Sequence, residues 1–132
     1  MTLRRILFLD ALTCLGCGAL MSLASGPLGT LLSLPAGLLL YAGLSLLPIA
    51  AFMGFVGARA TQSALAVWLV VLGNALWVFA SIGLLVSDAV SPNLLGKLFI
   101  GGQAAVVLLL TVLEAENVPR TQRRVGPLTP AR

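Results

Sequence analysis

The sequence predicts an all-α membrane protein that forms a four-transmembrane-helix antiparallel bundle with up-down-up-down topology. Of its 132 residues, 59% are hydrophobic and 9% are charged, whereas an average soluble domain carries about 25% charged residues. Residues 11–58 and 60–87 contain no charged side chain, and both stretches exceed the roughly 18 apolar residues that indicate a spanning helix. So few charges cannot cover a surface in water, and lipid must therefore be the solvent for most of the chain.

The first spanning helix is expected over residues 3–25. It should stop before Gly26 and Pro27, because glycine followed by proline interrupts a helix. Residues 26–34 are apolar and lie between two prolines. A connection in water would be more polar, and we therefore expect this one to lie in the membrane interface.

The second helix is expected over residues 35–58. Pro35 suits its first position, where the missing N–H has no intrahelical partner to lose. Pro48 falls inside the same stretch. It removes one backbone hydrogen bond and leaves the carbonyl of Leu44 free, which predicts a kink in helix 2 at Pro48.

Two further helices are expected over residues 63–87 and 92–117. Ser63 is a suitable N-cap for the third helix, and Ser91 followed by Pro92 predicts the start of the fourth. The four-span transmembrane bundle would then occupy residues 1–118. Residues 119–132 form a basic, proline-containing tail that we expect to be cytoplasmic and poorly ordered.

Basic residues gather on one side of this topology. Four spans place both termini on the same side, together with seven arginines: Arg4, Arg5, Arg59, Arg120, Arg123, Arg124 and Arg132. The other side carries Lys97 alone. The positive-inside rule therefore predicts that both termini are cytoplasmic. It also explains the net charge of +4 without nucleic acid as a partner.

Each predicted helix brings a hydrogen-bonding feature near the middle of the bilayer. Asn74 and Gln103 lie about 16 Å into the third and fourth helices at 1.5 Å per residue, and Trp77 lies beside the face that contains Asn74. The first interpretation is polar contacts between helices, each worth about 0.6–2 kcal/mol. The second is a binding site for a small polar group, with Trp77 as its wall. The first is the more common use of such residues.

Asp10 is the most informative residue, because it is the only acidic residue in the first three hydrophobic stretches. It lies about 7–8 Å deeper than Arg5 along a helix, where a carboxylate is costly unless it is paired or hydrated. A structural role predicts an ion pair with Arg59, Arg120 or Arg5. A functional role predicts a proton, cation or substrate site in a solvated cavity. The shallow depth and the nearby arginines favour the structural role.

Cys14 and Cys17 form a C-x-x-C spacing within the first helix. In a cytosolic protein this spacing suggests redox chemistry, but at bilayer depth desolvation disfavours the thiolate. Small residues at every fourth position, Cys14, Gly18 and Ser22, instead predict close helix packing. The sequence contains no histidine, which excludes histidine-ligated haem and zinc sites. We therefore expect no catalytic residue, no metal and no cofactor.

The run DALTCLGCGALMSLASGPLGTLLSLPAGLLLYAGLSLLPIAAF and the later VVLGNALWVFAS resemble a group of small bacterial four-span membrane proteins. This resemblance implies a location in the bacterial inner membrane and adds no site residue. The partners expected are the lipid bilayer and other membrane subunits or a second copy of the chain.

Three functions follow from these observations. The preferred one is a non-catalytic accessory or scaffold subunit of a larger membrane assembly, because the chain has few ionisable groups and no soluble domain. The alternative is a small oligomeric secondary transporter that uses Asp10 and resembles, in outline, the four-span proteins of the small multidrug resistance family. A membrane thiol–quinone redox protein that uses Cys14 and Cys17 is the third.

Overall fold

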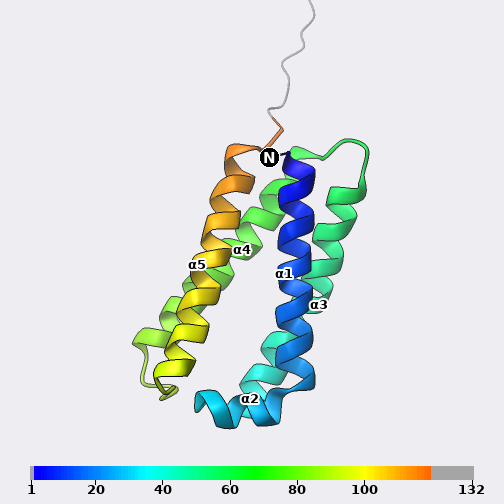
Figure 1. Cartoon of the computed structure of the whole chain (residues 1–132). Coiled ribbons are helices and arrows are strands. Elements are labelled where there is room, and N and C mark those ends of the chain that lie inside the picture. Colours follow the sequence, from blue (N-terminus) through cyan, green and yellow to red (C-terminus); the bar gives the residue numbers. More distant parts are fainter. Residues whose placement is uncertain (1, 120–132) are drawn as a thin grey trace, which may run out of the picture.

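The computed structural model describes residues 2–119, which form helices joined by short connections (Figure 1). The helices are, in chain order, α1 (Leu3–Leu23), α2 (Ser25–Leu32), α3 (Ala36–Ala58), α4 (Ala64–Val86) and α5 (Leu94–Glu116). Four of them, all except α2, contain 21 to 23 residues and are apolar enough to cross a membrane. At 1.5 Å per residue each is about 32–35 Å long, which matches a hydrocarbon core of roughly 30 Å. The predicted all-helical architecture with four potential spans is confirmed.

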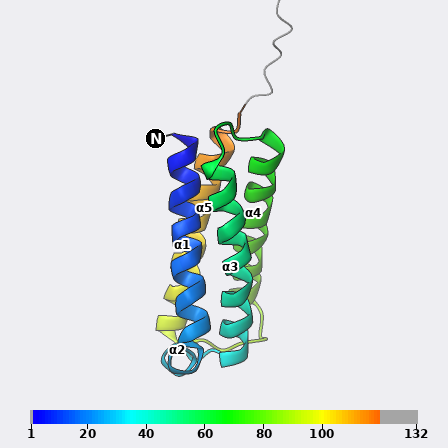
Figure 2. The same cartoon turned by 90° about the vertical axis from the view of Figure 1, so that its right-hand side faces the viewer.

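The four long helices form two pairs. α1 packs mainly on α3, and α4 packs mainly on α5, whereas contacts between the two pairs are far fewer (Figure 1). α1 begins and α5 ends at one end of the bundle, which we call the terminal end. α2 lies across the opposite end, as the view in Figure 2 also shows. Because α2 contacts α5 as well as α1 and α3, it helps to join the two pairs at this end.

The seam between α1 and α3 is built on small residues. Six of the seven buried residues of α3 recur at alternating intervals of four and three residues: Leu39, Gly43, Leu46, Ala50, Met53 and Gly57. This spacing is typical of two helices that pack along one face. A Cβ atom on Gly43 would lie 2.8 Å from the carbonyl oxygen of Gly18. The backbones of the two helices therefore touch, in the way that Gly18 on the predicted small-residue face of α1 suggested.

The segment after α1 differs from its expected structure. Residues 26–34 were predicted to be a connection, but Gly26 and Pro27 lie in the first turn of α2. Proline is tolerated there because the first N–H groups of a helix have no intrahelical partner. The helix is interrupted earlier, at Ala24, and α2 is followed by its C-cap Ser33, which has a left-handed conformation with φ of 54°.

The start of α5 also differs from its prediction. The N-cap is Asn93 rather than Ser91, and its Oδ1 atom accepts a hydrogen bond of 2.8 Å from the backbone N–H of Gly96. The Nδ2 atom of Asn93 donates to the carbonyl of Leu31 at 2.8 Å, and its backbone N–H donates to the carbonyl of Leu32 at 3.2 Å. One residue therefore caps α5 and satisfies the last carbonyls of α2, which holds the two helix pairs together at this end.

The helix α3 begins one residue later than expected, with Pro35 as its N-cap, and contains Pro48. The kink at Pro48 stays a prediction. Ser63 is the N-cap of α4, as the sequence indicated, although its side chain makes no capping hydrogen bond. Residues 120–132, which make up most of the predicted basic tail, lie outside the described residues.

Candidate functional site

Polar side chains from three helices meet between the two pairs. Asp10 of α1 and Glu114 of α5 are 0% exposed, and Asn74 of α4 is 3% exposed. The Nδ2 atom of Asn74 donates one hydrogen bond to Asp10 Oδ2 at 2.5 Å and another to Glu114 Oε2 at 3.1 Å. The thiol of Cys14 donates to Asp10 Oδ1 at 3.8 Å. Asp10, Asn74 and Glu114, with Cys14 beside them, are called the carboxyl cluster below.

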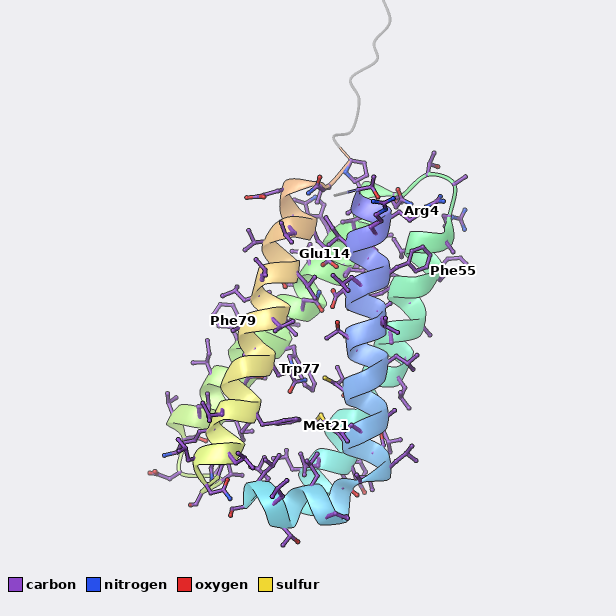
Figure 3. The ribbon with its side chains drawn as sticks, viewed as in Figure 1. Arg4, Met21, Phe55, Trp77, Phe79 and Glu114 are labelled. Carbon is purple, nitrogen blue, oxygen red and sulfur yellow. The ribbon has the colours of Figure 1, made fainter. Side chains whose placement is uncertain are left out.

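The carboxyl cluster lies in the most completely buried part of the protein. Apart from its two carboxylic residues, the largest fully buried side chains are Ile6, Leu7, Met53, Val56 and Val67. These residues belong to the beginning of α1, the end of α3 and the beginning of α4, and all therefore lie toward the terminal end. Figure 3 shows Glu114 in the same region, between its helix and α1. Apolar side chains thus surround the carboxyl groups.

The local helix positions explain why these side chains meet. Thr2 caps α1 by accepting a hydrogen bond from the N–H of Arg5, and Arg4 donates to the carbonyl of Arg59 at 2.9 Å, which ties the start of α1 to the end of α3. Asp10 follows about 10 Å further along α1 at 1.5 Å per residue. Glu114 lies two residues before the end of α5. Both carboxyl groups therefore lie in the same half of the bundle.

The cluster has more acceptors than donors. Asn74 supplies two N–H groups and Cys14 supplies one weak S–H donor, whereas the two carboxyl groups have four oxygen atoms. Glu114 Oε1 is buried and has no hydrogen-bond partner among residues 2–119. Placing one carboxylate within a membrane costs about 2.5–3.5 kcal/mol even on the mildest scale, and a second carboxylate beside it adds repulsion. Chemically, the arrangement is suited to take up a positive charge.

The expected ion pair between Asp10 and Arg59 is wrong. The partners of Asp10 in the described part of the chain are Asn74 and Cys14. The guanidinium group of Arg59 lies over the ring of Phe55, 5.3 Å from its centroid. The burial of Asp10 inside the bundle separates it from the arginines at the helix ends, and the hydrogen-bond donor comes from α4 instead. Arg5, another expected partner, is exposed and is not among the partners of Asp10 in the described part of the chain. Arg120, the third, lies outside the described residues.

The remaining candidates lie beside the cluster. Trp77 and Gln103 are half-buried and line a small space together with Cys14, Cys17 and Asn74. The structure therefore brings the polar features of α1, α4 and α5 together, whereas Pro48 lies elsewhere on α3. Both cysteines are free. Among the described residues, no group of three or more histidine, cysteine or acidic side chains is placed to hold a metal ion.

Glu114 is the residue that sequence reasoning missed. It lies near the end of the predicted fourth span, where an acidic residue is normally interpreted as part of the polar end of the helix. A signal was nevertheless present, because Ile100, Ala104, Val107, Thr111 and Glu114 recur at intervals of three and four residues and are all buried. Such spacing places them on one face of a helix. Glu114 therefore continues the inward-facing stripe of α5, whereas Glu116, two residues later, is exposed.

Comparisons of the chain with protein-family models, curated proteins and solved structures found no match. The features of the molecule that bear on its function are therefore the carboxyl cluster and the four long apolar helices.

Proposed function

We propose that this protein is a small proton-coupled secondary transporter of the bacterial inner membrane, in which Asp10 and Glu114 together bind one proton. The observation that carries the proposal is that two fully buried carboxyl groups share a single amide donor. One proton on the pair would remove one of the two negative charges and would provide the donor that the cluster lacks. Two carboxyl groups at close range commonly share a proton for this reason.

The position of the cluster suggests how proton binding could be coupled to movement. Asp10 belongs to the α1–α3 pair, whereas Asn74 and Glu114 belong to the α4–α5 pair, and the pairs have few other contacts. Loss of the proton would place two negative charges at this junction and favour its separation. Secondary transporters commonly move one helix bundle against another around a central site. In this proposal the protonated cluster holds the pairs together, and the ionised cluster loosens them.

Binding and release of a proton by the carboxyl pair can be tested by infrared spectroscopy. The purified protein in lipid nanodiscs is titrated through the neutral pH range. We expect a protonated-carboxyl C=O band in the wild type that disappears in Asp10→Asn and in Glu114→Gln. Glu116→Gln is the matched control, because it removes an exposed carboxyl group two residues away and should retain the band. If the wild type shows no such band, or if both cluster variants keep it, the carboxyl pair is structural and the accessory-subunit role is favoured.

We propose further that the four long helices cross the membrane in antiparallel order, with both termini in the cytoplasm. Seven arginines on that side against one lysine on the other support this orientation. A green fluorescent protein fused after Arg132 should fluoresce, and alkaline phosphatase inserted after Asp88, between α4 and α5, should be active. Phosphatase activity in a fusion after Arg132, with no activity at Asp88, would reverse the orientation.

A further inference from the structure

A larger cavity lies between the helix pairs, on the α2 side of the carboxyl cluster. Its volume is about 230 Å³, and residues from α1, α3, α4 and α5 line it. Figure 3 shows Met21 and Trp77, two of its lining residues, between the pairs. An apolar cavity of about 150 Å³ can hold a benzene ring. This cavity therefore has room for a larger apolar group, such as a ring that carries a polar substituent.

The lining of this cavity defines the chemistry of a ligand. Leucine, alanine, phenylalanine and isoleucine side chains supply most of it, and none of its lining residues is charged. The indole N–H of Trp77 is buried and has no hydrogen-bond partner within the described residues. A buried indole normally finds an acceptor. Neighbouring atoms cover this N–H, and a bound molecule can therefore supply the missing acceptor when the ring turns toward the cavity. The Gln103 side chain lines the same cavity and offers a second polar contact.

The cavity adjoins the carboxyl cluster through shared residues. Trp77 and Gln103 line both this cavity and the small space that Asn74 and Cys14 also line. Trp77 follows Asn74 by three residues, which is less than one turn of α4. A molecule bound against Trp77 would therefore lie close to the side chain that joins the two carboxyl groups.

We infer that this cavity binds a neutral, largely apolar molecule with one carbonyl-type acceptor, which accepts a hydrogen bond from the indole N–H of Trp77. Its assignment as the transported substrate rests on the proposed transporter function. A permanent cation does not suit the cavity, because no acidic side chain lines it. The same chemistry can come from a free lipophilic carbonyl compound or from the ester region of a membrane phospholipid.

The test uses benzophenone, a neutral ketone with two apolar rings, and diphenylmethane, which has the same rings but lacks the carbonyl group. Binding to the full-length protein in nanodiscs is measured by equilibrium dialysis. Benzophenone should bind about fivefold to tenfold more tightly than diphenylmethane, as expected for one hydrogen bond. Trp77→Phe should remove this preference, whereas Trp68→Phe, which alters an exposed tryptophan, should retain it. An unchanged preference in Trp77→Phe would overturn the role of the indole.

The second arm identifies the source of the ligand. In a Trp68→Phe background, Trp77 is the only tryptophan, and its fluorescence reports on the cavity. Saturable quenching by benzophenone supports a free compound, and quenching by phosphatidylcholine with brominated acyl chains supports a phospholipid. In either case Ala42→Leu, which fills the cavity from α3, should reduce the quenching. If Ala42→Leu folds normally and affects neither form of quenching, the cavity is not a ligand site.

The same measurements in Glu114→Gln separate this inference from the proposed function. Ketone binding that persists while the carboxyl band is lost shows that the cavity and the proton site are distinct, as inferred. A wild type that has the carboxyl band but does not distinguish benzophenone from diphenylmethane would refute the cavity inference and leave the proton site standing.

Discussion

Replacing Asn74 by leucine is expected to lower the free energy of unfolding by about 2–4 kcal/mol, because each buried polar group left without a partner costs about 1–3 kcal/mol. Asn74 is the side chain that donates to both Asp10 and Glu114. Leucine has the same branched shape and is no smaller, so that it leaves no cavity, but it has no donor. The loss should therefore come from the two carboxyl groups rather than from a cavity. Chemical unfolding in detergent, followed by circular dichroism, measures the change.

A matched control separates the loss of these hydrogen bonds from a general effect of replacing an amide. Gln103→Leu replaces an amide that is half-buried and lies outside the carboxyl cluster, and its effect should be much smaller. Removing the carboxyl groups should also relieve the loss, so that Asn74→Leu costs less in the Asp10→Asn, Glu114→Gln background than in the wild type. Equal costs in the two backgrounds would show that Asn74 does not act through the carboxyl pair.

Replacing Gly43 by alanine is expected to disrupt the α1–α3 pair. The added Cβ would lie 2.8 Å from three atoms of α1: the carbonyl oxygen of Gly18, the Cβ of Met21 and the backbone nitrogen of Ser22. Two of these are backbone atoms that cannot move without shifting the helix. Overpacking costs about 1–3 kcal/mol when side chains can adjust, and we expect a loss at or above the upper end of this range.

Gly54→Ala is the control for this prediction, because it lies on the same helix and its added Cβ would meet no atom within 4 Å. It should keep or slightly raise stability, since alanine favours a helix over glycine by about 1 kcal/mol. Thermal unfolding of both variants in the same detergent measures the difference. Similar midpoints for Gly43→Ala and Gly54→Ala would contradict the close approach of α1 and α3.

Short-range sequence patterns were enough to predict the long helices of this protein. The four long helices could be placed because runs of apolar residues between polar or proline-containing breaks are visible along the chain. The start of α5 and the helix α2 were not predicted. Pro27 and Pro92 each indicate that a helix boundary is near. They do not fix its position, because proline is compatible with the first turn of a helix as well as with the connection before it. Contacts such as those between Asn93 and the carbonyl of Leu31 decide between these positions.

The sequence by itself determined that the chain contains four apolar helices suited to a membrane, that Asp10 lies inside the first, and that arginines gather at one side. Hydropathy, charge and length along the chain carry this information. Only the tertiary structure decided that α1 pairs with α3 and α4 with α5, and that Asp10 meets Glu114 through Asn74 instead of an arginine. The physical reason is that the partner of a buried polar group depends on the direction in which each helix face points, and residues more than 100 positions apart become neighbours only when the helices pack.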